Sequence, residues 1–478
     1  MVPQKEVHQQ FDVAIIGAGV VGAAVARELS RYNLRCALIE AQDDVGTGTS
    51  KANTAIWHTG YDAQPGSLES KLLHRSYALM QAFMDESGVP YEKVGGLLIA
   101  WTAEEEQLLP SLLEKARANG DDNVRLLEAK ELYEREPRLA PGARAAMLVA
   151  DEGILCTFTL PLALATQAVK NGVTLYLNTP VTHIEQREGW HVLYTPNRQI
   201  RSRYLVNAAG LFADDVDRWL GHRSFTVTPR RGQLIVFDKL ARPLVNHVLL
   251  PVPTAITKGV LISPTVYGNV LLGPTAEDLA DKREKSTTEE GLAYLRQRGA
   301  AILPLLLEEE VTATYAGLRA ATEHSDYQIR IHADQRYVCV GGIRSTGVSG
   351  ALGIAEYVVM LLAGEGLQLQ RTAHFAPVQM PNIGELGVRP YQSGLLLASS
   401  ADYGQIVCHC ERVSRGELID AMQSTIPARS VDGLRRRTRA LQGRCQGFNC
   451  HAAILALLAE HTNQSAHALL GLDGNHAD

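Results

Sequence analysis

The feature that most constrains the fold of this chain is a run of glycines placed directly after an apolar stretch near its beginning. In the text "FDVAIIGAGVVGAAVARELSRYNLRCALIEA", the apolar segment Phe11–Ile16 leads straight into these glycines. The pattern predicts a buried strand, a tight turn over Gly17–Gly22, a helix over Ala23–Arg31 and a second strand over Arg35–Glu40. A βαβ unit of this kind, about thirty residues long, is typical of an open and mostly parallel α/β sheet.

The turn carries the spacing G-x-G-x-x-G at Gly17, Gly19 and Gly22. The first glycine permits the sharp turn, the second lets backbone N–H groups approach a pyrophosphate, and the third packs the helix against the strand. The helix N-terminus adds partial positive charge, and Glu40, at the end of the second strand, can accept the ribose hydroxyls. A glycine-rich turn without a ligand would not need all these parts together, so the unit predicts a dinucleotide site.

The composition limits the other functions that this chain could have. Its 478 residues carry a formal net charge of −6, with 46% hydrophobic and 21% charged residues. These values are ordinary for globular domains and do not favour nucleic acid or an anionic membrane as a partner. The polar start "MVPQKEVHQQ" lacks a signal-peptide pattern, and apolar stretches such as Tyr357–Gly364 are too short to span a bilayer. We therefore expect a cytoplasmic protein without a membrane span, where paired cysteines indicate metal or redox chemistry.

Three further motifs follow in order: "GTGTSKANTAIWHTGYD" after Glu40, "LVNAAGLFADDV" in the middle of the chain and "GGIRSTGVSG" near residue 345. Together they resemble the D-amino-acid-oxidase-like FAD superfamily, and within it the glycerol-3-phosphate dehydrogenases and the L-2-hydroxyglutarate dehydrogenases. The resemblance covers most of residues 10–365 and implies FAD as the cofactor. The FAD-binding residues that it implies are Gly17, Gly19, Val20, Gly22, Glu40, Thr49, Ser50, Asn53, Thr54, Val181, Ala209, Gly210, Gly342, Arg344, Gly347, Val348 and Ser349.

The third motif also suits a flavin on physical grounds. Reduction makes the flavin anionic around N1 and C2=O, and this charge needs stabilisation. Gly347–Ser349 open a predicted helix that runs toward Leu362, so their free N–H groups and the helix dipole would face that charge. Arg344 could add a full positive charge there, or it could form a surface salt bridge.

Oxidation of an alcohol or amine carbon needs a base for the proton and a group that orients the substrate. The resemblance places a histidine in the loop over the flavin, which makes His58 the candidate base. It also implies that Arg319, in "YAGLRAAT", binds a substrate carboxylate or phosphate, for which its planar fork is suited. A backbone-bonded histidine and a domain-interface arginine are the structural alternatives. Tyr267 could line the same pocket, as could Arg344, and Arg231 is a weaker candidate.

One departure from the family pattern bears on the substrate. The glycerol-3-phosphate dehydrogenases have a flavin motif that resembles GGK-x-T-T-Y-R, whereas this chain has "GGIRSTGVSG", closer to the hydroxyacid enzymes. We therefore expect a small anionic hydroxy compound, a 2-hydroxyacid or a polyol phosphate or acid. A secondary amine, oxidised by an imino-acid, opine or hydroxyproline type of dehydrogenase with the same fold, is the alternative.

Four of the seven cysteines lie in a short C-terminal block as two close pairs, Cys408-x-Cys410 and Cys445-x4-Cys450. Four thiolates can hold a [2Fe–2S] cluster or a structural zinc, and spacing alone does not separate the two. The text from "VCHCERV" to "GRCQGFNC" resembles the bacterioferritin-associated-ferredoxin-like [2Fe–2S] domain, which implies that these four cysteines ligate a cluster. The other three, Cys36, Cys156 and Cys339, have apolar contexts typical of buried structural thiols.

A flavin accepts two electrons at once and a [2Fe–2S] cluster accepts one, so the two together indicate a relay to a partner. The family implies a hetero-oligomer with an electron-transfer subunit or a second flavoprotein. A zinc-stabilised tail that only binds a partner is the competing interpretation. An arginine-rich segment at residues 435–444 could raise the potential of a cluster, form a solvated helix face or bind an acidic partner.

The predicted fold is thus an α/β FAD-binding Rossmann-like domain with an inserted antiparallel-sheet substrate domain, followed by a small helical [2Fe–2S] domain. We expect the FAD-binding domain at residues 10–95 and 336–370. The substrate domain is expected at 96–335, interleaved with FAD-binding segments at about 145–220. A linker at 371–402 then leads to the [2Fe–2S] domain at 403–478.

Overall fold

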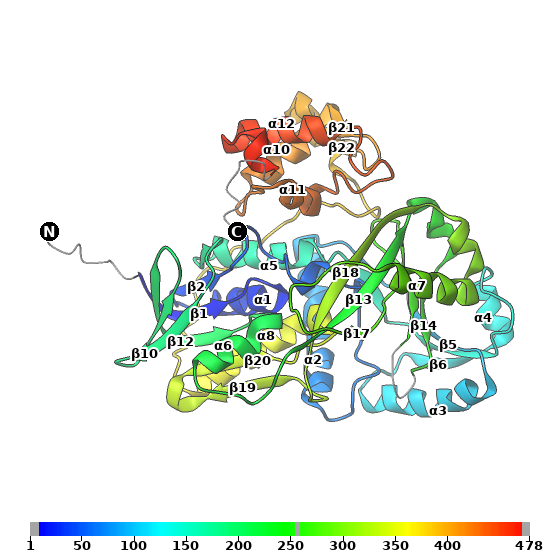
Figure 1. Ribbon diagram of the computed structural model, residues 1–478, viewed down its shortest axis with the longest axis horizontal. Helices are drawn as coiled ribbons and strands as arrows, with labels where there is room; N and C mark the ends of the chain where they lie inside the picture. Colours follow the sequence, from blue (N-terminus) through cyan, green and yellow to red (C-terminus); the bar gives the residue numbers. More distant parts are fainter. Residues whose placement is uncertain (1–8, 254–258, 471–478) are drawn as a thin grey trace.

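The computed structural model describes residues 9–253 and 259–470. Two large sheets lie side by side, a small three-stranded sheet joins them, and a helical C-terminal module stands on top (Figure 1). The predicted fold class is therefore confirmed: an α/β nucleotide-type domain with an inserted, mainly antiparallel sheet and a small helical module.

The first large sheet has eight strands, with β10-β11-β12-β1-β2-β9 in a row, β20 paired to β12 and β19 paired to β20. Strands β1, β2, β9, β12 and β20 run parallel to one another, as the βαβ pattern predicts, whereas β11 and β19 pair antiparallel with β12 and β20. Helices α1, α5 and α8 pack together beside this sheet, and α6 contacts β10, β12 and β20. The strands are β1 (Gln9–Ile16), β2 (Cys36–Ile39), β9 (Thr174–Tyr176), β10 (His183–Arg187), β11 (Trp190–Tyr194), β12 (Gln199–Asn207), β19 (Gln328–His332) and β20 (Tyr337–Gly341). The helices are α1 (Val20–Leu29), α5 (Thr159–Lys170), α6 (Ala213–Trp219) and α8 (Gly347–Gly364).

The second large sheet has nine strands in the order β17-β13-β16-β15-β14-β5-β7-β6, with β18 along β13. All of its pairs are antiparallel except β14 with β5. Helices α3, α4 and α7 contact its strands. The strands are β5 (Gly96–Ala100), β6 (Val124–Glu128), β7 (Ala145–Val149), β13 (Thr228–Phe237), β14 (Val248–Pro251), β15 (Leu261–Pro264), β16 (Val270–Gly273), β17 (Glu277–Asp278) and β18 (Val311–Ala321), and the helices are α3 (Ala103–Ala118), α4 (Ala129–Arg135) and α7 (Glu289–Ile302).

A small sheet of β3 (Ile56–Trp57), β8 (Gly153–Leu155) and β4 (Tyr91–Glu92) lies between the two large ones. Helix α2 (Leu68–Ser87) packs against α8 and so ties this region to the nucleotide-type domain. Because Trp57 pairs with Gly153, the loop after β3 is held next to the segment that precedes β8. This pairing decides which side chains meet at the site described below.

Two predicted domain boundaries differ from the observed sheets. Strand β7, placed at the start of an FAD-binding segment, pairs with β5 and β6 in the nine-stranded sheet. Strand β19, placed in the substrate domain, pairs with β20 in the eight-stranded sheet. Both are short, partly apolar strands, and their sheet is set by partners far along the chain, which local patterning does not reveal. Helix α1 also begins earlier than predicted, at Val20 inside the glycine motif.

Helix α8 is the one described helix whose length and composition would let it cross a membrane. Its eighteen residues include buried positions from Ser349 to Leu362, and it packs on both α1 and α2. This is the packing of a core helix, whose apolar surface is covered by protein.

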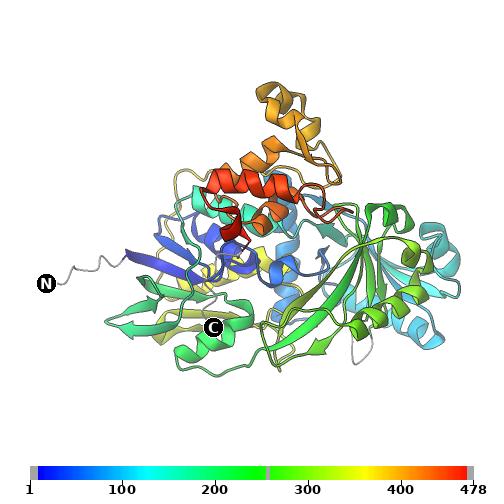
Figure 2. The ribbon, with the colours of Figure 1, turned by 45° about the horizontal axis from the view of Figure 1, so that its top comes forward.

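The C-terminal module contains a two-stranded sheet and four helices, and Figure 2 shows it lying over the edge of the body. A small core that includes Cys408, Cys450 and Leu434 holds it together. Its elements are β21 (Ile406–Cys408), β22 (Val413–Ser414), α10 (Arg415–Gln423), α11 (Val431–Thr438), α12 (His451–Thr462) and α13 (Ala466–Leu469). The preceding segment, predicted as a linker, has one short helix, α9 (Gly394–Ser399).

Candidate active site and cysteine cluster

A single cavity of about 1590 Å³ runs between the two large sheets and reaches the C-terminal module. It exceeds the roughly 300–1,000 Å³ of most small-molecule pockets, so it has room for a dinucleotide together with a substrate. Most of the residues predicted from the sequence line it: Gly17, Gly19, Val20, Glu40, Thr49, Ser50, Asn53, Thr54, His58, Val181, Ala209, Gly210, Arg319, Gly342, Arg344, Gly347 and Val348. Gly22, Ser349 and Tyr267 are not among the lining residues.

The glycine turn is packed as a pyrophosphate-binding turn must be. Gly17 has a φ of +97°, and a Cβ there would lie 2.5 Å from the carbonyl oxygen of Ala208. A Cβ on Gly22 would lie 1.9 Å from the carbonyl oxygen of Gly17, so the helix and the turn touch directly. Gly22 therefore acts by close packing, and Gly19, the N-cap of α1, opens the helix toward the cavity.

Glu40 ends β2 at the wall of the cavity. Its carboxylate accepts hydrogen bonds from the N–H of Ala18 at 2.8 Å and from the N–H of Gln42 at 3.0 Å. Burial raises its pKa, while these backbone N–H groups oppose the rise. The carboxylate is thus fixed beside the glycine turn, where ribose hydroxyls of a dinucleotide could bind.

The loop after β2 is held against the glycine turn on one side and β18 on the other. The Ser50 hydroxyl accepts a hydrogen bond from the N–H of Val20 at 2.9 Å, and Thr49 donates to the carbonyl of Leu318 at 2.8 Å. A Cβ on Gly317 would lie 1.9 Å from the carbonyl oxygen of Ala52, so strand and loop backbones are in contact. These contacts hold the loop in place, so that its polar side chains line the cavity.

His58 follows β3 and reaches the cavity beside a buried acid. Its Nδ1 lies 3.2 Å from Oε2 of Glu152, whose side chain is completely buried. The other oxygen of Glu152 accepts hydrogen bonds from the N–H of Thr59 at 2.9 Å and from its hydroxyl at 3.3 Å. The backbone N–H of His58 donates to the hydroxyl of Ser349 at 2.9 Å, which explains how Ser349 contributes without lining the cavity. The two atoms are within ion-pair range but form no hydrogen bond in this geometry, and a proton on Nδ1 facing Glu152 would make Nε2 the basic nitrogen.

Sequence reasoning missed Glu152. It lies 94 positions from His58, and only the pairing of β3 with β8 brings the two together. Nothing in the text "DEGILC" marks this acid, although a carboxylate directly before a buried strand is a weak signal in retrospect.

Arg319 projects from β18 into the same cavity. Its two terminal nitrogens lie 3.4 Å from the carbonyl oxygen of Thr275, and among residues 9–253 and 259–470 no carboxylate lies within 4.0 Å of it. Burial, with a smaller contribution from the neighbouring cation Arg230, lowers the pKa of Arg319 to about 10. A guanidinium in this state remains charged at neutral pH and lacks a counter-ion, so it can receive an anionic ligand.

Three of the predicted substrate-binding residues lie outside the cavity or are already paired. Tyr267 packs beneath the guanidinium of Arg439 at 4.2 Å and shares a hydrogen bond of 2.9 Å with Cys156, so its prediction as a pocket residue is wrong. Arg344 lines the cavity, but its guanidinium bonds to Glu69 at 2.9 Å. Arg231 is buried and paired with Glu277 at 2.6 Å. For Arg231 and Tyr267, a strand pattern did not reveal on which face the side chain lies.

The four C-terminal cysteines come together from β21, the turn after it and the loop before α12. All are free thiols; Cys408 and Cys450 are buried, and Cys410 and Cys445 are half-buried. They meet as two pairs, since Cys410 interacts with Cys445 and Cys450 with Cys408. Four thiols in this arrangement can supply the ligands of a [2Fe–2S] cluster.

The loop around Cys445 favours a thiolate. The N–H of Asn449 lowers the pKa of Cys445 most, burial opposes it, and Cys410 and the N–H groups of Gly447 and Phe448 lower it further. Backbone donors to sulfur of this kind stabilise the thiolate ligands of iron–sulfur clusters.

The arginine-rich segment is mainly an internal contact between the C-terminal module and the body. Asp44 receives hydrogen bonds from Arg436 at 2.7 Å and from both terminal nitrogens of Arg437 at 2.6 and 2.8 Å. Arg439 donates to Asn269 at 2.9 Å. These three arginines are buried, so the interpretation of a solvated basic face is wrong for them.

Comparison with protein families gives two matches. Residues 12–361 match the family described as FAD dependent oxidoreductase, and residues 406–460 match the BFD-like [2Fe-2S] binding domain. Both cofactors predicted from the sequence are therefore confirmed, and with them the resemblances on which they were based.

Similar proteins cover different shares of the chain. A glycerol 3-phosphate dehydrogenase from Caloramator mitchellensis is 38% identical over 455 residues, which is 94% of each chain. An L-2-hydroxyglutarate dehydrogenase from Caenorhabditis briggsae is 30% identical and covers 59% of this chain and 67% of its own. The structure of reduced L-α-glycerophosphate oxidase from Mycoplasma pneumoniae with FAD bound has 29% identity and a TM-score of 0.74. It covers 78% of this chain and all of its own.

Proposed function

Since this chain belongs to the FAD dependent oxidoreductase family and is an FAD-dependent enzyme that acts on a CH–OH group, we propose that its substrate is glycerol 3-phosphate. We propose further that its electrons leave through the C-terminal [2Fe–2S] domain to a partner protein. One observation carries the choice of an anionic hydroxy substrate: an unpaired guanidinium and a histidine–carboxylate pair face one cavity.

Arg319 is the group that would bind the phosphate. Its guanidinium has no acidic partner among the described residues, and its two terminal nitrogens point toward the same carbonyl at long distance. A phosphate oxygen pair could replace these weak contacts with two charge-assisted hydrogen bonds. The neighbouring Arg230 is already held by Asp278 at 2.6 and 2.9 Å, whereas Arg319 has no such partner among the described residues.

His58 is the group that would take the hydroxyl proton. The buried carboxylate of Glu152 lies 3.2 Å from Nδ1, so Nε2 is the nitrogen that would act as the base, and the carboxylate would stabilise the imidazolium that forms. Bound FAD supplies the acceptor for the hydride equivalent from the same carbon. The chain's part is to orient the hydroxyl toward Nε2 while Arg319 fixes the anionic end.

The dehydrogenase relative supports a role for the C-terminal domain in electron exit. The relative named as a dehydrogenase matches 94% of this chain, whereas a glycerol 3-phosphate oxidase from Mycoplasma pneumoniae matches 73% of it with 94% of its own length. The protein named as an oxidase thus has little chain left for a second redox domain. A one-electron centre would pass electrons to an acceptor protein in place of oxygen. The free cysteines suit a reducing cytoplasm.

A 2-hydroxyacid such as 2-hydroxyglutarate is the second candidate, favoured by "GGIRSTGVSG" where the glycerol-3-phosphate dehydrogenases have a different motif. Arg344 of this motif lines the cavity, and a second carboxylate could compete with Glu69 for it. A phosphate monoester carries its charge of about −1.5 to −2 on one group, so it does not need a second cation at a separate position. Replacing Arg344 with Gln should therefore affect a dicarboxylate more than glycerol 3-phosphate.

The test is anaerobic reduction of the purified protein by candidate substrates, followed by absorption and by iron analysis. We expect glycerol 3-phosphate to bleach the flavin and then to reduce a cluster with about two irons per chain. If 2-hydroxyglutarate or a secondary amine bleaches the flavin faster at equal concentration, the substrate proposal is refuted. If the cluster stays oxidised after the flavin is reduced, the electron exit is refuted.

A further inference from the structure

Two ionic contacts between the C-terminal module and the body are buried, and exposed pairs of Arg444 and of Asp432 lie beside them. The first joins α11 to the loop after β2, where Asp44 binds Arg436 and Arg437. Asp44 is 3% exposed, and these cations lower its pKa against the opposing effect of burial. Since the N–H of Gly46, two residues on, donates to the carbonyl of Ala18, this contact lies next to the glycine turn.

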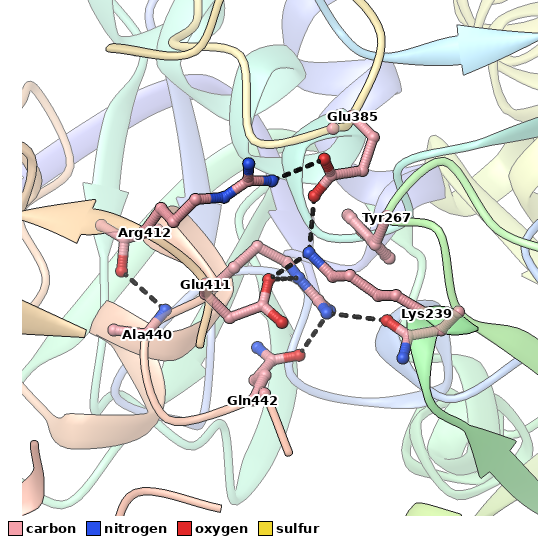
Figure 3. A network of polar contacts seen from close by, with 12 residues as sticks. Lys239, Tyr267, Glu385, Glu411, Arg412, Ala440 and Gln442 are labelled. Atoms are coloured by element: carbon pink, nitrogen blue, oxygen red, sulfur yellow. Dashed lines mark hydrogen bonds and ion pairs between the residues drawn. The ribbon is translucent and has the colours of Figure 1, made fainter. Parts of the chain in front are cut away.

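The second contact joins the turn after Cys410 to the nine-stranded sheet (Figure 3). Lys239 lies between two carboxylates, 2.5 Å from Glu385 and 2.9 Å from Glu411. Glu411 is 2% exposed and also accepts from Nε of Arg439 at 3.3 Å. Arg412 completes the group at 3.0 Å from Glu385.

Both contacts are close to functional parts of the molecule. Glu411 is the residue directly after Cys410, so Lys239 holds the backbone of a cluster ligand. Ser430, Asp432 and Arg436, all from the C-terminal module, line the same cavity as the glycine turn. The module therefore forms part of the wall of the cofactor cavity.

The backbone of the segment after α11, which takes part in the second contact, has uncommon conformations. Arg439 and Leu441 have φ values of +71° and +67°, although neither is a glycine. Such residues persist where surrounding contacts over-determine them. Arg439 is fixed by Glu411, by Asn269 at 2.9 Å and by the face of Tyr267 at 4.2 Å.

We propose that Asp44 and Lys239 are positioning residues that lock the [2Fe–2S] domain in one orientation over the flavin cavity. This inference rests on the proposed electron exit. It goes further, because it assigns the orientation to two ion clusters that touch neither redox centre. Substitution of Asp44 or Lys239 leaves buried charges without partners, so the module should separate from the body at that contact.

Two variants test the lock from opposite sides: Asp44→Asn at the nucleotide-type domain and Lys239→Gln at the nine-stranded sheet. Arg75→Gln serves as the control, because Arg75 forms a similar two-bond pair with Glu356 on the exposed face of α2. Hydrogen exchange of the amides in α11 and residues 406–414 is measured in protein with and without iron. Rapid mixing with glycerol 3-phosphate separates flavin bleaching from cluster reduction.

We expect both variants to retain flavin and to bleach at the rate of the unaltered protein. Exchange in the two segments should rise by roughly 100-fold, because breaking a buried ion pair frees a local unit. Cluster reduction should slow by about tenfold or more, and Arg75→Gln should change neither quantity.

Three results would overturn the proposal: unchanged exchange in both variants, increased exchange with normal cluster reduction, or slower cluster reduction with unchanged exchange. The last would assign the effect to the cluster potential. If the cluster of the unaltered protein is not reduced by substrate, the proposed function fails instead, and the exchange measurements still decide whether the lock exists.

Discussion

Replacement of Arg319 by methionine should weaken substrate binding without damaging the protein. Arg319 is half-buried, and burial together with Arg230 lowers its pKa from about 12.5 to about 10. At about 1.4 kcal/mol for each factor of ten this is at most about 3 kcal/mol, which solvent in the cavity reduces. A bound anion recovers this energy by providing the missing counter-charge. Loss of up to about 3 kcal/mol corresponds to a KM higher by up to roughly 100-fold for glycerol 3-phosphate, with kcat little changed if the phosphate is held equally in both states.

The stability of the same variant separates this role from a structural one. An uncompensated buried charge replaced by an apolar side chain of similar length is neutral or stabilising. We therefore expect Arg319→Met to have an unchanged or higher Tm and full FAD content. Arg231→Met is the matched control on the neighbouring strand, because it removes an arginine already paired with Glu277 and should leave KM within about twofold. A normal KM in Arg319→Met would place the anion site elsewhere.

The pH dependence of binding follows from the same pKa. Arg319 has its pKa lowered to about 10, so the cation is fully present at neutral pH and is lost as the pH rises through about 10. KM for an anionic substrate should consequently increase above about pH 9, since the free enzyme then loses the charge that binds the anion. This alkaline increase should be absent from Arg319→Met, and its persistence there would assign the titration to another group.

Other changes give direct readouts at separate parts of the molecule. His58→Gln should slow flavin bleaching by about 10²–10⁴ while FAD remains bound, as measured by stopped-flow absorption. Glu152→Gln should shift the pH profile of the same step, because the amide no longer stabilises the imidazolium, and an unaltered profile would remove Glu152 from the mechanism. Cys445→Ser should leave bleaching intact but abolish transfer to an external acceptor, whereas normal acceptor turnover would refute the relay. Gly22→Ala forces a methyl group to within 1.9 Å of the Gly17 carbonyl oxygen, so the purified protein should lack flavin and lose about 1–3 kcal/mol of stability.

The parts of the site that the sequence predicted are those whose chemistry lies within a few residues. The glycine turn, Glu40 and the start of α8 are local backbone features, and each is where the pattern placed it. The spacings Cys408-x-Cys410 and Cys445-x4-Cys450 are local signals too, although in the structure Cys410 lies against Cys445 and Cys408 against Cys450. Their assembly into one cluster site followed from the family resemblance; the domain match confirms the [2Fe–2S] domain, and the ligand set stays a prediction.

The parts that the sequence did not predict depend on contacts between distant segments. Glu152 reaches His58 only through the small sheet, and Tyr267 faces the C-terminal module because β15 and β16 place its loop there. The arginines of α11 have the composition of an exposed helix. Their burial depends on Asp44, which lies 393 residues from Arg437 and in no motif. Charge patterning along one helix cannot reveal a partner of this kind.

Burial alone does not identify a functional arginine in this chain. The hydrogen-bond and ion-pair partners of each guanidinium do identify it. Both terminal nitrogens of Arg437 bond to Asp44 and to backbone carbonyls, which makes it structural. Arg27 also has its pKa lowered to about 10 by burial, but it donates to Gln167 at 2.6 Å and stacks on Phe83 at 4.5 Å, so its surroundings are complete. Arg319 has only two long contacts to one carbonyl and faces a cavity. Since a half-buried cation without an acidic partner is costly and Arg319 lines the same cavity as His58, an anion that arrives with the substrate would supply the missing counter-charge.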